Sequence, residues 1–316
     1  MEKIIKEPGI YPGVTYEEYA QWSGINNTTL WKLKSTSPMH CKHYLDNPPP
    51  STDALRIGSA MHIQILEPQE FDKRFMVIPK WNMATKDGKA EFASYVIDLA
   101  DKKTLTVAQT DQMIEAKKGK RDLLIGALAL AGLDVLDQAE LDTVQAMYAR
   151  LKEQDAYQYI TGRRDSDTEL AIVWDDEETG IRCKAKIDYA NRDGCILCDL
   201  KSTEVAAEHA FRRSVEKYGY YQQAAFYSDG WQALTGDLCS FLFIAAEKSP
   251  PHCCCSYEPD ENTLLAGRHS YRAALKLWKK CVDSDTWPGY NDDKISLLSV
   301  SQWLLTQEGV GVHQVI

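Results

Sequence analysis

The amino-acid sequence predicts a mixed α/β fold in which a central mixed sheet is flanked by helices. Three short runs rich in β-branched and aromatic residues lie between Glu169 and Lys201, separated by two polar turns. Helical patterns precede and follow these runs, and two later apolar runs are typical of buried strands. The expected order is therefore helices, three strands, a helix, two strands and a helix.

The helices before the strands have recognisable ends. Candidate N-caps stand at Thr15, Asn27 and Ser37, and a helix from about 54 to 66 is closed by Glu67-Pro68. The stretch of about 90–160 has a helical pattern and forms an expected insertion. The N-terminal part of the protein is therefore expected to be helical.

After the strands we expect one long helix at about 206–234, strands at about 237–246 and 253–257, and a helix at about 261–287. No low-complexity linker divides the chain, so residues 1–316 are expected to form a single domain. Its parts are the N-terminal helices (1–68), the helical insertion (about 90–160), and the sheet with its flanking helices (169–316).

Composition limits the class of protein. The chain has 316 residues, a formal net charge of −10 and nine cysteines. Its first residues lack the apolar segment of a secretory signal, and the longest apolar run, 123–133, is too short to span a bilayer. We therefore expect a cytoplasmic protein with reduced cysteines and no membrane contact. The charge argues against a basic coat protein for nucleic acid, but an enzyme with one basic channel stays compatible.

Each of the three strand runs carries an acidic residue. Alternation places Asp199 and Lys201 on one face of the third strand, and it places Asp188 with Lys184 and Lys186 in the second. The other face of the second strand would carry Ile181, Cys183, Ala185, Ile187 and Tyr189. If both turns are simple hairpins, Glu169 lies opposite Asp188, and Asp188 lies diagonally from Asp199, roughly 7–8 Å away. Three carboxylates and a lysine would then share one sheet face.

This spacing leaves two interpretations open. Converging acids repel one another unless a cation neutralises them or they face water. Mg²⁺ prefers carboxylate, carbonyl and water ligands, and a lysine beside it can polarise a bound water or stabilise charge on a phosphate. Alternatively, Lys184 and Lys186 neutralise the acids in a solvent-facing sheet, and Asp199 and Lys201 form a surface ion pair.

The cysteines do not favour a metal cluster. Cys195 and Cys198 form a C-x-x-C pair, but alternation places them on opposite faces of their strand. Three consecutive cysteines at 253–255 cannot all point at one cluster, and a suitable loop spacing is missing there. We therefore expect no iron–sulfur cluster and no zinc site.

Several ordered motifs resemble one known family. G-I-Y-P-G-V-T-Y-E-E-Y, S-P-M-H-C-K-H-Y-L, A-L-R-I-G-S-A-M-H-I-Q-I-L-E-P-Q-E-F and K-Y-G-Y-Y-Q-Q-A-A-F-Y occur in that order. Together with the D-L-K of the third strand, they make the chain similar to the RecE-type exonuclease VIII family of the PD-(D/E)xK nuclease superfamily. The resemblance covers nearly the whole chain except about 90–135, which is longer than usual. It implies a restriction-endonuclease-like core.

The resemblance also implies roles for individual residues. Asp188 and Asp199 would hold the metal, with the Leu200 carbonyl as a further ligand, His62 at the edge of the site and Glu169 as an auxiliary acid. Lys201 would orient or activate the attacking water. Gln223 and Tyr227 match a Q-x-x-x-Y element that touches the metal-site water or the DNA backbone, and Gln222 is an equally placed rival for that glutamine. Without the resemblance, the two glutamines and Tyr227 could equally well be residues that pack a helix on the sheet.

The activity implied by the resemblance is Mg²⁺-dependent exonuclease cleavage of linear double-stranded DNA, with Mn²⁺ as a possible substitute. The 5′-ended strand would be degraded from 5′ to 3′, leaving 3′ single-stranded tails. The same source implies a RecT-type single-strand annealing recombinase as partner and a ring-shaped homo-oligomer, with a tetramer favoured, in a bacterial cytoplasm and encoded by a phage or prophage. The alternatives are an endonuclease or single-strand-specific nuclease of the same superfamily, or a non-catalytic DNA-binding scaffold.

Overall fold

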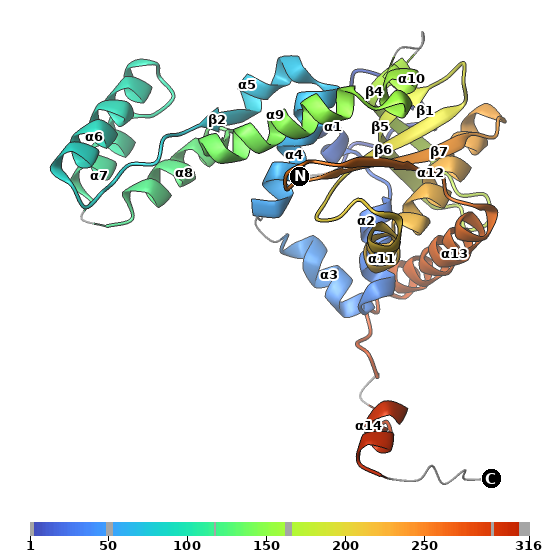
Figure 1. The fold of residues 1–316 in the computed structure, drawn as a ribbon. Coiled ribbons are helices and arrows are strands. Elements are labelled where there is room, and N and C mark those ends of the chain that lie inside the picture. Colours follow the sequence, from blue (N-terminus) through green and yellow to red (C-terminus); the bar gives the residue numbers. More distant parts are fainter. Residues whose placement is uncertain (1–2, 49–52, 117, 162–165, 292–293, 310–316) are drawn as a thin grey trace.

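A computed structural model describes residues 3–48, 53–116, 118–161, 166–291 and 294–309 (Figure 1). Its centre is a six-stranded sheet with helices on both faces. The predicted mixed α/β class, with a central mixed sheet flanked by helices, is confirmed. So are the helical N-terminal part and the helices within 90–160.

The sheet has the strand order β1-β4-β5-β6-β7-β8. The strands are β1 (Gly9–Tyr11), β4 (Ser166–Asp175), β5 (Arg182–Asn191), β6 (Ile196–Thr203), β7 (Ser240–Glu247) and β8 (Cys254–Tyr257). Neighbours are antiparallel except for β6 and β7, which are parallel and are joined through two helices. Strand β1 was not expected, because three residues beside turn signals give too little alternation to detect.

The hairpin between β4 and β5 has the predicted register. Thr168 pairs with Tyr189 and Leu170 with Ile187, so Glu169 stands opposite Asp188. The backbone of Glu169 is left-handed, with φ of 52°. A non-glycine residue in this region is strained, and such strain is often found at functional sites.

The register between β5 and β6 differs from the prediction. Its ladder pairs run from Asn191–Ile196 to Tyr189–Cys198, so Asp199 stands directly opposite Asp188 and not diagonally from it. The prediction was wrong because the loop after Asn191 holds four residues, 192–195, which is two more than a simple hairpin assumes, with Cys195 in the left-handed region at φ of 45°.

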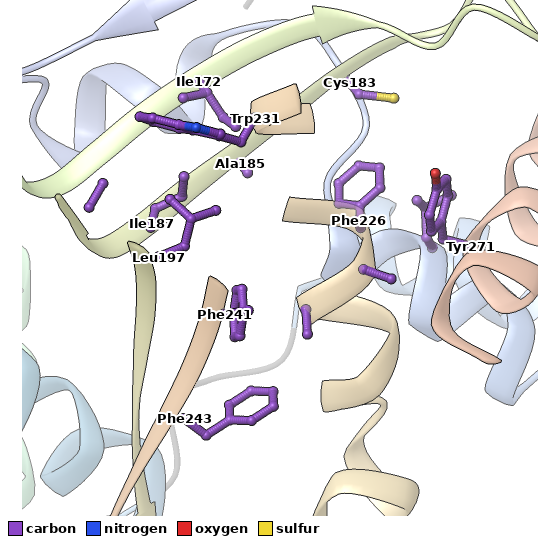
Figure 2. Packing of buried hydrophobic residues seen from close by; sticks show 14 of the residues in the cluster. Ile172, Cys183, Ala185, Ile187, Leu197, Phe226, Trp231, Phe241, Phe243 and Tyr271 are labelled. Carbon is purple, nitrogen blue, oxygen red and sulfur yellow. The ribbon is translucent and has the colours of Figure 1, made fainter. Parts of the chain in front are cut away.

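One face of the sheet is covered by α12 (Tyr220–Thr235), with α13 (Glu261–Ser284) packed against it. Figure 2 shows the apolar core between α12 and the strands, which includes Ile172, Ala185, Ile187, Leu197, Phe226, Trp231, Phe241 and Phe243. The two helices approach closely at Gly267, where a Cβ atom would lie 2.2 Å from the Tyr221 carbonyl oxygen. This packing fixes α12 over the strands that carry the acids.

The opposite face is covered by α4 (Asp53–Leu66) and α9 (Gln138–Lys152) at one side and by α1 (Tyr16–Gln21) at the other. Apolar residues of α4 and α9 pack on Cys198, Leu200 and Tyr189. Tyr189 was predicted to share the face of Ile187, which is wrong. Ile187 and Ala190 both belong to the core under α12, so strict alternation fails in β5 between Asp188 and Tyr189.

The single long helix expected at 206–234 is two helices. Helix α11 (Glu208–Tyr218) ends at Gly219, whose φ is 71°, and α12 begins at the next residue. A Cβ atom at Gly219 would lie 2.3 Å from the Trp31 ring, so both the backbone and the packing require glycine. The remaining helices near the sheet are α2 (Asn27–Ser35), α3 (Pro38–Asp46), α5 (Phe71–Arg74) and α10 (Asp155–Thr161).

Residues 78–135 form an arm that extends away from the sheet (Figure 1). It contains α6 (Lys86–Asp101), α7 (Val107–Glu115) and α8 (Lys120–Leu130), and at its base β2 (Phe75–Val77) pairs in parallel with β3 (Asp134–Leu136). The arm has its own core, which includes Ile78, Phe92, Val96, Met113, Leu124 and Leu128. We propose that the chain is one domain with this arm as an insertion.

The C-terminal residues that the structure describes carry a short helix, α14 (Gln302–Gln307), set apart from the sheet (Figure 1). Across the described parts of the chain, every helix falls short of the length and apolar character that a membrane span requires.

Candidate metal-dependent active site

His62, Glu169 and Asp188 come together beside the sheet. One ligand atom from each lies within 4.8 Å of the others, and His62 Nδ1 is 3.5 Å from Asp188 Oδ2. The carboxylates come from β4 and β5, and the imidazole from the middle of α4, which packs on the strands through Met61 and Ile65. The apolar stripe of α4 therefore places the histidine over the acids.

The side chain of Asp188 also connects β5 to β6 directly beyond the Tyr189–Cys198 pair, where the ladder between these strands ends. Its Oδ2 accepts a hydrogen bond from the backbone N–H of Leu200 at 2.7 Å. In a strand, the N–H and C=O of one residue point toward the same neighbour, so the Leu200 carbonyl also faces the Asp188 side of β6. Leu200 lines the same cleft as Asp188.

A second group of polar side chains connects β6 to α12. Asp199 Oδ2 lies 2.5 Å from Lys201 Nζ, and Asp199 Oδ1 accepts a hydrogen bond from Gln223 Nε2 at 2.5 Å. Lys201 Nζ donates to Gln223 Oε1 at 3.0 Å, which closes a three-membered network. Tyr227 lies one turn further along α12, where burial raises the pKa of its hydroxyl and the side chain of Gln223 acts in the opposite direction.

The choice between the two glutamines follows from these contacts. Gln222 is fully buried, donates to Asn27 Oδ1 at 2.9 Å, and accepts from Ser270 Oγ at 2.7 Å. It therefore joins α12 to α2 and α13. Gln223 is the glutamine that faces Asp199 and Lys201.

The groups do not share one sheet face as predicted. Cys198 and Leu200 pack toward α4, so Asp199 and Lys201 point toward α12, whereas Asp188 contacts His62 of α4. The acids approach one another from both sides of the point where β5 and β6 separate. Simple alternation could not predict this, because it treats the strands as a continuous flat sheet.

The two lysines of β5 have different partners. Lys186 forms an ion pair with Glu169, so the alternative interpretation holds for this one acid. Lys184 is buried and donates to the carbonyl oxygens of Tyr19 and Trp22 at 2.9 and 2.8 Å, at the end of α1. Burial lowers the pKa of Lys184 to about 8. Lys184 therefore holds α1 on the sheet and leaves Asp188 to other partners.

A cleft of about 670 Å³ opens between α1, α2 and α4 and reaches these groups. His62, Glu169, Asp188, Leu200, Lys201 and Tyr227 all line it. Asp199 is 3% exposed and stands behind Lys201. A polar substrate that entered the cleft would meet one histidine, three carboxylates, two ammonium groups and one guanidinium group.

A family model described as a PDDEXK-like domain of unknown function (DUF3799) matches residues 28–296. The chain belongs to this family. The match includes every strand from β4 to β8 and every side chain of the site. The predicted membership of the PD-(D/E)xK superfamily is thereby confirmed, while the finer RecE-type assignment stays a prediction.

One solved structure has a similar fold over most of the chain. The crystal structure of a "Putative exonuclease" from Eubacterium rectale aligns over 93% of this chain and 98% of its own, with a TM-score of 0.59 and 14% identity. An alkaline exonuclease from Laribacter hongkongensis aligns over 62% of this chain and 100% of its own, with 16% identity and a TM-score of 0.19. A search of curated proteins finds no match. The first of these similarities concerns the fold, and the second is too weak to carry an argument.

Asp188 and Lys201 of the PDDEXK-like site both have pKa values above their ordinary range, for different reasons. Burial, together with nearby Asp199 and Glu169, raises the pKa of Asp188 to about 7, although His62 and Lys201 act in the opposite direction. Burial disfavours the charge of Lys201, but Asp199, Tyr220 and Asp188 outweigh it and raise the pKa of the lysine above its ordinary value. The site therefore holds its lysine as an ammonium, while Asp188 holds a proton more tightly than an ordinary aspartate does.

These residues suit a hard divalent cation. One buried oxygen, Asp199 Oδ2, has no hydrogen-bond donor in suitable geometry among the described residues, although the Lys201 ammonium is adjacent. The pKa of Asp188 is raised mainly by burial and further by the nearby carboxylates of Asp199 and Glu169. Carboxylate oxygens with one imidazole and one backbone carbonyl are acceptable ligands for Mg²⁺ or Mn²⁺.

Glu67 and Tyr220 line the cleft and were not among the predicted site residues. Glu67 directly follows α4, and burial and nearby Glu169 raise the pKa of its carboxyl. It was interpreted only as a helix end before Pro68. Tyr220 lies with its ring centroid 4.3 Å from Lys201 Nζ. Its position directly after Gly219 is the signal that could have identified it, since that glycine breaks the helix beside the site.

Replacing Asp188 with asparagine should stabilise the metal-free protein at pH 8. The folded state holds a proton on Asp188 more tightly than the unfolded state, so this contribution to stability is present below about pH 4 and is lost as the pH rises through about 7. Asparagine keeps an acceptor for Leu200 and removes the charge. We expect a gain on the order of 2 kcal/mol in urea unfolding with EDTA at pH 8, and little gain at pH 5.

Asp175→Asn is a matched control for this experiment. Asp175 lies in the neighbouring strand β4, is exposed, and pairs with Arg182, so its loss should give no gain at either pH. A lower stability of the Asp188→Asn protein at pH 8 would contradict the assigned charge balance.

Proposed function

We propose that this protein is a divalent-metal-dependent nuclease that hydrolyses phosphodiester bonds of DNA. The observation that carries the proposal is the combination in one cleft of the His62–Glu169–Asp188 group and a charged Lys201. Phosphodiester hydrolysis requires a nucleophilic water and stabilisation of charge on the phosphate and leaving oxygen. Family membership adds support, because the family is PDDEXK-like.

In this proposal Asp188 and Asp199 hold the metal from the two separating strands. The Leu200 carbonyl is a further ligand, His62 stands at the edge, and Glu169 is an auxiliary acid. Mg²⁺ is the expected ion, with Mn²⁺ as a substitute, and when bound it supplies Lewis-acid activation of water and phosphate. The position of Asp188 and Asp199 directly beyond the Tyr189–Cys198 pair, where the ladder between β5 and β6 ends, supports this assignment.

Lys201 acts as a charged donor in this scheme. Because its pKa is raised, it cannot accept a proton near neutral pH, so it orients the water or stabilises negative charge at the phosphate. Gln223 fixes Asp199 and Lys201 relative to each other, and Tyr227 lies beside Gln223, one turn further along α12. Gln223 and Tyr227 are therefore positioning residues for the ammonium.

Lys201→Ala should lower the rate of DNA cleavage in Mg²⁺ by at least about 100-fold, since the charge at the phosphate is lost. The rate of release of labelled nucleotides measures this, with EDTA as the metal-free reference. Lys276→Ala removes a surface lysine paired with Glu178 and should cleave normally. A thermal melt verifies that both variants are folded. Unchanged activity of Lys201→Ala would overturn the role assigned to Lys201, whereas no cleavage by the parent protein would favour the non-catalytic scaffold.

We further propose that the substrate is linear double-stranded DNA and that the 5′-ended strand is degraded, which leaves 3′ tails. The support is the resemblance of the ordered motifs to RecE-type exonucleases. Such tails are the substrate of a RecT-type annealing recombinase, which we propose as the partner. We also propose that the protein is encoded by a phage or prophage and acts in the bacterial cytoplasm. Both proposals rest on the same resemblance. The competing proposal is an endonuclease or single-strand-specific nuclease.

Strand-labelled linear duplex should lose label from its 5′ ends in Mg²⁺, while covalently closed DNA of the same sequence should stay intact. The physical reason is that an exonuclease requires a free end to enter the cleft. Gel analysis of both forms over time gives the result, and the Asp199→Ala protein serves as the inactive control. Cleavage of the closed form would establish the endonuclease instead.

We also propose a ring-shaped homo-oligomer, with a tetramer favoured. A subunit with net charge −10 repels DNA unless its basic residues are gathered along one path. A ring with Lys and Arg side chains on its inner surface and acids outside would achieve this. Light scattering of the purified protein should give a mass near four times 35.7 kDa. A monomeric mass would rule out the ring.

A further inference from the structure

A second hollow of about 420 Å³ adjoins the cleft on the far side of Tyr220. The two spaces share Ser202 and Tyr220 in their linings. The hollow is formed by the end of β6, the loop that follows it, and the turn between α11 and α12. Its position beside Lys201 connects it to the site, since Lys201 Nζ lies 4.3 Å from the Tyr220 ring centroid.

The chemistry of this hollow differs from that of the cleft. Its charged residues, Glu204 and Lys248, form an ion pair at 2.6 Å and so neutralise each other. The other lining residues are hydroxyl-bearing or apolar: Ser202, Thr203, Val205, Ala210, Phe211, Ser214, Tyr218 and Tyr220. A phosphate would therefore favour the cleft, whereas an uncharged, flat, polar-edged group would favour the hollow.

Two tyrosines form an aromatic wall on this hollow. Tyr218 ends α11 and Tyr220 begins α12, and their ring centroids are 5.7 Å apart with an angle of 32° between the planes. The left-handed Gly219 between them turns the chain so that both rings face the hollow. Tyr218 is 49% exposed, so a ligand can cover a ring that water now contacts.

We propose that this hollow is a subsite for the nucleobase of an unpaired nucleotide at the cleavage position. Every nucleobase has a π face that stacks on aromatic side chains, and its edges find hydroxyl donors and acceptors here. A base that enters the hollow cannot keep its pairing partner, because protein encloses it on several sides. The subsite therefore requires that the end of the duplex opens before cleavage. This inference rests on the proposed nuclease activity.

Duplexes with a three-nucleotide unpaired end test the subsite, with those three bases either present or replaced by abasic residues. For the parent protein, removal of the bases should raise KM by roughly tenfold, the loss expected from one stacked base. Tyr218→Ala should raise KM by a similar factor on the substrate with bases and should have no effect on the abasic one. Tyr218→Phe keeps the ring and should behave as the parent.

Tyr290→Ala is the matched control, because Tyr290 is 70% exposed and is not among the residues that line either space. Equal KM values of the parent protein for both substrates would overturn the subsite while leaving the nuclease in place. So would an equal effect of Tyr218→Ala on both substrates. If the parent protein cleaves neither substrate, the proposed function itself fails, and the subsite fails with it.

Discussion

The site depends on one hydrogen bond, from the backbone N–H of Leu200 to the side chain of Asp188. Beyond the Tyr189–Cys198 pair, β5 and β6 separate, and a strand that leaves its neighbour exposes an N–H group that must find another acceptor. The carboxylate of Asp188 provides that acceptor. A buried acid is thus held between two strands by the need to satisfy the backbone, and the same gap admits Asp199 and Lys201 from the other side.

The charge distribution around this hydrogen bond explains why the site is built from both flanks of the sheet. Three carboxylates lie close together near the point where β5 and β6 separate. They repel one another, and each is stabilised by a different set of partners. Glu169 pairs with Lys186, Asp199 with Lys201 and Gln223, and Asp188 has a neutral hydrogen bond and an imidazole. Because His62 and Gln223 come from helices far apart in sequence, the packing of α4 and α12 sets the electrostatics of the strands.

Much of the fold and of the site could be predicted from local patterns. The turn chemistry and β-branched runs gave β4, β5 and β6, and the hairpin register set Glu169 opposite Asp188. The face of Tyr189, the position of Asp199 relative to Asp188, and the break at Gly219 could not be predicted in this way. The position of Asp199 and the break at Gly219 result from left-handed backbone residues, Cys195 and Gly219, and such residues are selected by tertiary packing, here against Trp31 in the case of Gly219. His62 could be named only through the family resemblance, because a single histidine in a helix has no local signal.

The arm of residues 78–135 has a core of its own, and the strands β2 and β3 at its base carry the chain out and back. The residues of that core are distinct from those packed around the sheet. Loosening of α6, α7 and α8 would therefore remove no contact from Asp188, Asp199 or Lys201, and the arm can open as a separate cooperative unit. For evolution, this makes the arm a segment whose length and surface are free to change while the chemistry of the sheet is preserved.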